Sequence, residues 1–533
     1  MTFAISKENK MSELGEFPAM NSYVLPLGRE VCALTKGREI KGLLSILVLA
    51  GTFLYVNLFL LPRTPMLMTG DQMFFWMDAQ RMLHGDHAYR DFFQFTPPGT
   101  DLVYFAFFRI FGPHLWVTNA VVLLLGIALC AVCFFVTSGV MEQGPAVLAT
   151  LLFLTLLYGR TLNATHHWFS MLLILSAAAI AIRGKSLPRT VVVGICLGAA
   201  AFFTQSHGLV AVLAFGLWLV WEELPARESW LDTLSRPATL MVSFAVSLLA
   251  FSAYFLVTSG ASALWYCQVV YVKQYMVSGL SQFPGLAEFP TWRRLPIVGQ
   301  SIFVCAMLPA VYPLAMLRSQ RIGRNQSATR NGIMLLALLG LALFLEVLSS
   351  ANWLRLYAVA IPGIGLLVWC ANSSGRMRRA ALGLIWLVVI CLGLHQTWAR
   401  QRQNYVVTET PGGRVAVDAR NFAELNALKE QTRPGELLFQ AVWPGFYIPL
   451  RLLNPVYVDT IWPNEESRPE FVERSIKELE AKQVPHILWS QNLDYPDPAN
   501  PQSDHLGPLR DYLHEHYRRV QVFSDQDELW ERK

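Results

Sequence analysis

Long apolar runs alternate with short polar segments over the first three quarters of the chain. Several runs approach the roughly 17–25 residues that a helix needs to cross a bilayer, and the shorter ones need flanking residues to do so. The pattern predicts about eleven transmembrane helices. The predicted runs are Leu43–Leu61, Leu115–Val136, Ala146–Tyr158, Trp168–Ile182, Val191–Phe203, Leu209–Trp221, Ala238–Val257, Ile297–Leu317, Ile333–Leu348, Leu356–Ala371 and Ala380–Leu394.

The same pattern divides the chain into three parts. Residues 1–41 form a polar N-terminal segment, and residues 42–399 hold all of the apolar runs. In residues 400–533, short apolar strand-like runs alternate with polar helical patterns, which predicts a small α/β domain. The expected strands are Leu437–Val442, His486–Ser490 and Val520–Ser524. The expected helices are Glu470–Lys482 and Leu509–His516.

Composition supports a polytopic α-helical membrane protein. Of the 533 residues, 53% are hydrophobic and 15% are charged, whereas a soluble domain carries roughly a quarter charged residues. The net charge of +5 is small. Because the basic residues lie mainly in short loops, they indicate membrane orientation rather than nucleic-acid binding.

The basic residues also predict which loops face the cytoplasm. With a cytoplasmic N-terminus, every inside loop carries arginine or lysine except the loop near Glu142. The short outside connections carry only Arg160 and Arg355. An odd number of spans places residues 400–533 outside. The inside loops carry Arg183, Lys185, Arg189, Arg227, Arg236, Arg318, Arg321, Arg324, Arg330, Arg376, Arg378 and Arg379.

The first outer loop, residues 63–114, holds the main acidic residues near the membrane. Asp71 follows a Thr-Gly pair and opens a predicted helix over Gln72–Leu83. The helix macrodipole stabilises a carboxylate at this position, although a simple capping role is an equal alternative. Asp78 is seven residues further on and falls on the same helical face. The other acids of the loop are Asp86, Asp91 and Asp101.

Two short motifs follow in the same loop. In Tyr89-Arg90-Asp91, the two charged residues either pair with each other at the surface or serve the chemistry of a site. In Pro97-Pro98-Gly99, the prolines fix an extended turn before the next helix.

These residues resemble the bacterial GT-C membrane glycosyltransferases. More narrowly, they resemble the group of protein O-mannosyltransferases, aminoarabinose transferases and rhizobial galacturonosyltransferase-like enzymes. Many relatives have a second acidic residue directly after the first, where this chain has Gln72. The residues that match are Asp71, Ala79, Leu83, Gly85, Tyr89, Arg90, Asp91, Phe92, Pro97, Pro98, Gly99, Phe111 and Gly112, and more weakly Gln205–Gly208, Arg355–Tyr357 and Pro362.

The resemblance implies transfer of a sugar from a polyprenyl-phosphate donor to a hydroxyl on an envelope lipid, polysaccharide or protein. The attacking hydroxyl must lose a proton, and Asp71 is our candidate general base, with Asp91 as helper or substrate ligand. The leaving lipid phosphate needs a cation. Arg355 is the first candidate because an arginine at an outer helix end is costly unless paired, and Arg90 and Lys273 come next.

Further candidates for substrate binding lie at the outer ends of the predicted helices. They could contact phosphate, sugar hydroxyls or a metal, and histidines are also ordinary anchors at membrane interfaces. The resemblance implies no certain cofactor, and a divalent metal is an open alternative. These candidates are His166, His167, Gln205, His207 and Tyr89.

The expected location is the bacterial inner membrane, with the C-terminal domain on the periplasmic or extracellular side and no nucleic-acid partner. One alternative is a polysaccharide ligase or polymerase, which would place essential arginine and histidine in a large late loop. A lipid-linked sugar transporter would show charges in mid-helix and paired halves. A non-enzymatic scaffold would leave the acidic first loop unexplained.

Overall fold

The computed structural model describes residues 25–224, 230–275, 299–300, 302–323, 326–441, 443–496, 500–523 and 526–533. Side chains are described from residue 39 onward, except for residues 230–232. Most of the predicted N-terminal segment, residues 1–41, therefore lies outside the described residues. Residues 276–298, which include most of the polar part of the outer loop Ser259–Pro296, lie outside them as well.

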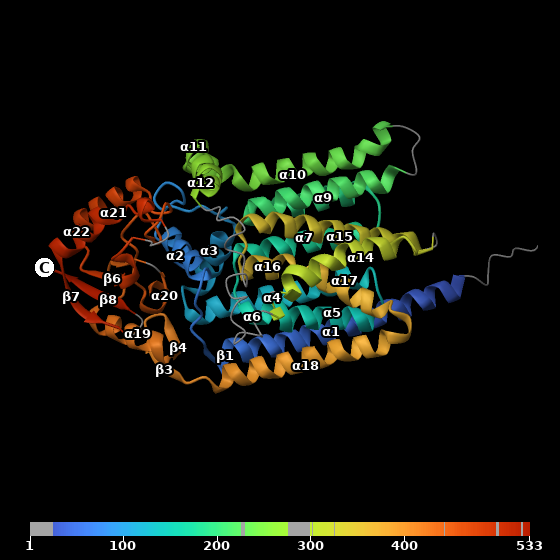
Figure 1. The fold of residues 1–533 in the computed structure, drawn as a ribbon, viewed down its shortest axis with the longest axis horizontal. Helices are drawn as coiled ribbons and strands as arrows, with labels where there is room; N and C mark the ends of the chain where they lie inside the picture. Colours follow the sequence, from blue (N-terminus) through green and yellow to red (C-terminus); the bar gives the residue numbers. More distant parts are fainter. Residues whose placement is uncertain are drawn as a thin grey trace, which may run out of the picture.

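The N-terminal three quarters form a long bundle of helices that run roughly along one axis (Figure 1). Most of each apolar run predicted from the sequence is helical where it is described. Leu43–Leu61 ends in a short strand at Phe59–Leu60, and Leu356–Ala371 is divided at Ala360 between two helices. The helices are α1 Leu25–Leu58, α4 Leu115–Ser138, α5 Gln143–Phe153 continued by η1 Leu154–Tyr158 and α6 Gly159–Thr161, α7 His166–Ile182, α8 Leu187–Phe203, α9 Gln205–Glu223, α10 Trp230–Thr258, η6 Phe303–Met307 with α14 Leu308–Ser319, α15 Ser327–Val347, α16 Trp353–Val359, α17 Ile361–Asn372 and α18 Arg378–Arg402.

The length of its apolar helices indicates that the chain is a multi-pass membrane protein. Among the described residues, 6 helices are long and apolar enough to cross a membrane, or up to 7 if the bent pair of α16 and α17 forms one span. Shorter apolar helices include α7 and α8. Such helices reach across a bilayer only with flanking residues, so the number of eleven spans stays a prediction.

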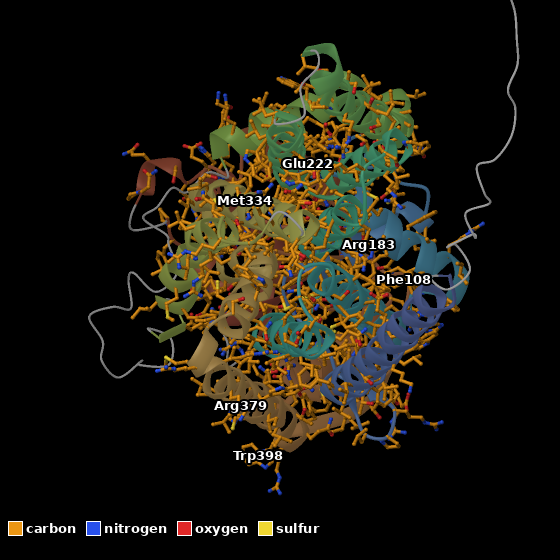
Figure 2. The ribbon with its side chains drawn as sticks, turned by 90° about the vertical axis from the view of Figure 1, so that its right-hand side faces the viewer. Phe108, Arg183, Glu222, Met334, Arg379 and Trp398 are labelled. Carbon is orange, nitrogen blue, oxygen red and sulfur yellow. The ribbon has the colours of Figure 1, made fainter. Side chains whose placement is uncertain are left out.

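Basic and acidic side chains pair at the end of the bundle away from the C-terminal part, which Figure 2 views with Glu222 labelled. Glu222 lies 3.0 Å from Arg236 and 3.4 Å from Lys185. Glu142, in the loop without a basic residue of its own, lies 3.0 Å from Arg378. The loops predicted to face the cytoplasm therefore meet at one end of the bundle.

The first outer loop lies between the opposite end of the bundle and the C-terminal part (Figure 1). It begins with a short hairpin of β1 (Phe59–Leu60) and β2 (Thr64–Pro65). Two helices follow, α2 (Gln72–Leu83), as predicted, and α3 (Gly99–Phe111). A further helical segment after α10 lies beside the same region and comprises α11 Ala261–Trp265, η3 Tyr266–Tyr271 and α12 Val272–Tyr275.

The C-terminal part contains a hairpin and a mixed sheet. In the sheet, the strand order is β5-β6-β8-β7, with β5 and β6 parallel and the other pairs antiparallel. The strands are β3 Tyr405–Thr410, β4 Gly413–Asp418, β5 Leu438–Gln440, β6 His486–Ser490, β7 Tyr517–Val522 and β8 Asp527–Arg532, and the helices are α19 Ala419–Gln431, α20 Tyr447–Leu450, α21 Pro469–Ala481 and α22 Gly507–His516.

Strand contacts join this part to the first outer loop. Leu67 N donates a hydrogen bond of 2.8 Å to Ala416 O on β4, and Met66 and Ala416 form a parallel bridge. Apolar positions of β5 and β6, such as Leu438 and Ile487, are buried, whereas Val520 and Val522, in the predicted strand Val520–Ser524, are exposed. Strand β8 was not predicted because its sequence is largely polar or charged. The β3–β4 hairpin was missed although its strands hold the apolar runs Tyr405–Val407 and Val415–Val417.

Gly99, the last residue of the Pro-Pro-Gly motif, permits a close helix contact. A Cβ placed there would lie 2.7 Å from Phe202 O and 2.9 Å from the ring of Phe203, at the end of α8. A side chain of any size would therefore push α3 away from α8. Gly216, inside α9, has nothing within 4 Å of the same position.

We expect Gly99→Ala to lower the melting temperature of the purified protein because the added methyl group meets backbone atoms. Gly216→Ala is the matched control, since it removes a helical glycine and is expected to leave stability unchanged or raise it by about 0.5–1 kcal/mol. Thermal unfolding in detergent measures both. Equal melting temperatures for the two variants would contradict the close contact.

Candidate active site

A cavity of about 490 Å³ lies between the first outer loop, the start of α7 and the C-terminal part. Its volume is within the range of small-molecule sites, roughly 300–1,000 Å³. Aromatic side chains and a few polar groups form its wall. The lining residues are Asp71, Phe74, Phe75, Phe93, Gln94, Phe95, Thr96, His166, Tyr271, Trp443, Val458, Asp459, Thr460, Ile461, Trp462, Asn464, Glu466, Ser467, Phe471 and Val472.

Asp71 lies at the start of α2 but does not cap it. Its side chain makes no capping hydrogen bond to the helix and lines the cavity, where it is accessible. Gly70, with φ of 98°, supplies the left-handed backbone of the preceding turn. Burial among the surrounding residues raises the pKa of Asp71, while a backbone hydrogen bond and the charge of Arg355 lower it. A carboxylate with a raised pKa is a better proton acceptor near neutral pH.

Arg355 lies close enough to Asp71 for its charge to affect that carboxylate. It stands in the first turn of α16, where the side chain of Asn352 accepts a hydrogen bond of 2.9 Å from its backbone N–H. Its Nη1 donates to Ser350 O at 3.0 Å. This contact uses only part of a guanidinium that carries five N–H donors, so the remaining donors are suited to an anion.

Three histidines form a row beside these groups. The rings of His166 and His167 are 3.8 Å apart, and those of His167 and His207 are 5.2 Å apart. His166 Nδ1 lies 3.0 Å from Thr204 Oγ1, and His207 Nε2 lies 3.5 Å from Glu346 Oε2. Of the three, His166 lines the cavity, and the other two lie deeper in the bundle.

Arg90 and Asp91 pair with each other outside the cavity lining. Arg90 Nη2 lies 2.7 Å from Asp91 Oδ2, and the hydrogen bond from Arg90 lowers the pKa of Asp91 to about 2. Lys273 is exposed on α12 and also does not line the cavity. By contrast, Asp71 and His166 line the cavity, and the charge of Arg355 acts on both, although Arg355 is not itself among the lining residues.

Tyr89 and Gln205 belong to a hydrogen-bonded chain that positions the loop. The hydroxyl of Tyr89 donates to Thr96 O at 2.8 Å and accepts from Gln268 Nε2 at 2.8 Å. Gln205 Nε2 donates to Gln268 O at 3.1 Å. Tyr89 has φ of 70°, a strained value for a residue with a side chain. These hydrogen bonds connect Thr96, which lines the cavity, to α9 and to the helical segment after α10.

Three buried carboxyl groups meet behind the cavity wall, and the sequence analysis did not group them. Asp459 faces the cavity from the C-terminal part, and Asp78 and Asp101 are fully buried. Asp78 Oδ2 accepts a hydrogen bond of 2.7 Å from Gln94 Nε2. Burial and the neighbouring carboxyl groups raise the pKa of Asp78 and of Asp101. Carboxyl groups placed together cannot all ionise, so this cluster retains protons.

Gln72, where the resemblance leads us to expect a second acidic residue, contacts the backbone of two loops. Its Oε1 accepts a hydrogen bond of 3.3 Å from Ala164 N, and its Nε2 contacts Thr69 O at 3.4 Å. Within the described part of the chain, no group of three or more His, Cys, Asp or Glu residues is placed to hold a metal ion.

This arrangement, a helical membrane bundle with an acidic first loop under a C-terminal α/β part, is the GT-C fold that the sequence resemblance implied. ArnT from Cupriavidus metallidurans bound to undecaprenyl phosphate is similar, with a TM-score of 0.59 and 13% identity over 91% of this chain and 97% of that chain. Its apo state gives the same TM-score at 14% identity over the same shares.

The oligosaccharyltransferase AglB from Archaeoglobus fulgidus, in complex with an inhibitory peptide and a dolichol-phosphate, has a TM-score of 0.49 and 12% identity. That match covers 92% of this chain and 74% of that chain. No protein-family model and no curated protein matches the sequence. At these identities, the likeness to ArnT shows the fold.

The protonation of Asp459 predicts how stability depends on pH. Burial raises its pKa from a usual 3.8 to about 7. The folded protein therefore holds this proton up to about pH 7, whereas the unfolded chain releases it near pH 4, and the resulting stabilisation falls as the pH rises between these values. Asp459→Asn, which stays uncharged, should melt several degrees above the parent at pH 8, with the difference closing towards pH 5.

Asp91→Asn is the control, because the pKa of Asp91 is shifted in the opposite direction: the hydrogen bond from Arg90 lowers it to about 2. Its stabilisation is present above pH 4, so this variant should melt no higher than the parent at pH 8. Melting curves from pH 4 to 8 in detergent measure both. A pH profile of Asp459→Asn parallel to that of the parent would show that Asp459 is ionised in the folded protein.

Proposed function

We propose that the protein is a glycosyltransferase that moves a sugar from a polyprenyl-phosphate donor to a hydroxyl acceptor on the outer face of the membrane. The observation that carries this proposal is the placement of Asp71 on the wall of a cavity, within electrostatic reach of Arg355. The similarity to ArnT, whose structure holds undecaprenyl phosphate, supports the choice of donor.

Asp71 is the proposed general base. An acceptor hydroxyl that attacks the anomeric carbon loses its proton as the new glycosidic bond forms, and the bond from that carbon to the phosphate oxygen breaks. Asp71 takes the proton, which its raised pKa favours. Direct displacement of this kind needs no covalent intermediate on the enzyme. It inverts the configuration of the anomeric carbon.

Arg355 is the proposed ligand of the leaving phosphate. The phosphate gains negative charge as the sugar departs, and a fixed guanidinium stabilises that charge. His166, which lines the cavity and contacts Thr204, is suited to a sugar hydroxyl or a phosphate oxygen. Arg355 does not line the cavity, but its charge acts on Asp71 and His166, which do. Asp91, Arg90 and Lys273 have supporting roles at most, since Arg90 and Asp91 pair with each other and Lys273 is exposed on α12.

The proposed topology follows the distribution of basic loops. Eleven spans, a cytoplasmic N-terminal segment (residues 1–41) and a transmembrane domain (residues 42–399) place the C-terminal domain (residues 400–533) outside, in the inner membrane of a bacterium. The pairing of Glu222 and Glu142 with basic residues at one end of the bundle supports this orientation. The acceptor then comes from the cell envelope.

Removal of the proposed base tests the function. The purified protein is given a polyprenyl-phosphate-linked sugar with an envelope acceptor fraction, and free polyprenyl phosphate is measured. Asp71→Asn should slow its release by about 10²–10⁴-fold, the usual contribution of a general base.

Asp511→Asn serves as the control for this experiment. It changes the same residue type at an exposed position of α22, away from the cavity, and should turn over like the parent. If Asp71→Asn folds normally and turns over as fast as Asp511→Asn, Asp71 is not the base.

A further inference from the structure

A second cavity, of about 370 Å³, adjoins the first one and is not used by the proposed mechanism. One wall is the turn of Thr69 and Gly70, which leads directly into Asp71. The opposite wall comes from the C-terminal part. Trp443 lines both cavities, so its indole forms part of the boundary between them.

The lining of this second cavity combines polar and charged groups with the apolar side chains of Leu67, Met73 and Phe446. Arg420, Asn421 and Glu424 come from the first turns of α19 and face Gln440 of β5 and Asp527 at the start of β8. All five carry planar groups that form hydrogen bonds in defined directions. The Oε1 atom of Gln440 accepts from Phe446 N at 3.2 Å.

This chemistry distinguishes between classes of ligand. A prenyl or acyl chain would meet some apolar residues here, Leu67, Met73 and Phe446, but it would also lie against the charged groups of Arg420, Glu424 and Asp527. A phosphate group requires an excess of positive charge, whereas Arg420 stands here beside two carboxylates, Glu424 and Asp527. A saccharide fits both features, because its hydroxyls pair with amide, carboxylate and guanidinium groups and its C–H face packs against an aromatic ring.

Trp443 supplies that aromatic ring. Its side chain is 42% exposed, large for a tryptophan inside a folded protein. Phe74 and Trp462 hold it in place, with ring centroids 5.7 Å and 6.2 Å away. The indole is thus fixed from the side of the first cavity and accessible to a ligand.

We propose that the second cavity binds the carbohydrate of the acceptor, an inference that rests on the proposed function. A saccharide held against Trp443 by Arg420 and Asn421 would direct its next hydroxyl past the Thr69–Gly70 turn to Asp71. The acceptor is then a glycan or the sugar headgroup of a glycolipid. The C-terminal part selects the acceptor, and the bundle holds the donor.

Binding of envelope glycans tests this assignment without turnover. The full chain in lipid nanodiscs is applied to an array of bacterial-envelope oligosaccharides, each printed both free and lipid-linked. The parent should bind at least one saccharide. Asn421→Trp, which fills the cavity with an indole, should lose at least tenfold in affinity, and Arg420→Ala should weaken binding in the same direction with less risk to folding.

Asn426→Trp is the matched control, since it places the same side chain further along α19, outside the cavity lining. It should bind as the parent does. No binding to any saccharide, or binding that Asn421→Trp and Arg420→Ala leave unchanged, would overturn the assignment. Equal affinity for free and lipid-linked forms would indicate a glycan acceptor, and tighter binding of the lipid-linked form would indicate a glycolipid.

The same array separates this inference from the proposed function. Asp71→Asn should retain glycan binding while it loses turnover, because Asp71 lines the first cavity. If Asp71→Asn turns over normally and glycan binding still depends on Asn421, the carbohydrate site stands and the role of Asp71 fails. If turnover needs Asp71 but no saccharide binds, the role of Asp71 stands and the carbohydrate site fails.

Discussion

The buried guanidinium of Arg81 joins the first outer loop to the C-terminal part, and the cavities depend on that junction. Its Nη1 donates to Val456 O at 2.7 Å, and its Nη2 donates to Asp91 O at 3.0 Å. Its Nε pairs with Asp86 at 3.0 Å, and its plane lies 4.9 Å from the centre of the Phe92 ring. Each of the three nitrogens of this buried arginine has a partner, so it fixes the geometry around it, and loss of a partner leaves its charge less compensated.

This junction explains why the acids of one loop have different chemistry. Asp71 lines the cavity, and the charge of Arg355 acts on it. Asp91 pairs with Arg90 at the surface. Asp78 is buried against Asp459 of the C-terminal part and retains a proton. One loop therefore holds an accessible carboxylate and a buried carboxyl group that keeps its proton, so the environment of each residue, rather than its type, sets its chemistry.

The sequence predicted the elements well and their contacts poorly. Periodicity located α2 and the apolar runs because each spans many residues, and Asp71 followed from its place after the first run. The sequence did not identify Asp459 and Trp443 as site residues. They contact the first loop only in the folded protein, and more than 350 residues separate them from their partners Asp78 and Phe74. The pairing of Arg90 with Asp91 was foreseen as one alternative, and packing decided between the two.

The central claim is that the cavity under the C-terminal part holds the phosphate end of a lipid-linked donor between Asp71 and Arg355. A structure of the protein with bound polyprenyl phosphate measures this most directly. The account predicts a phosphate within hydrogen-bonding distance of the Arg355 guanidinium, with Asp71 facing the place of the sugar. A phosphate bound at another surface, with the cavity closed to it, would contradict the account.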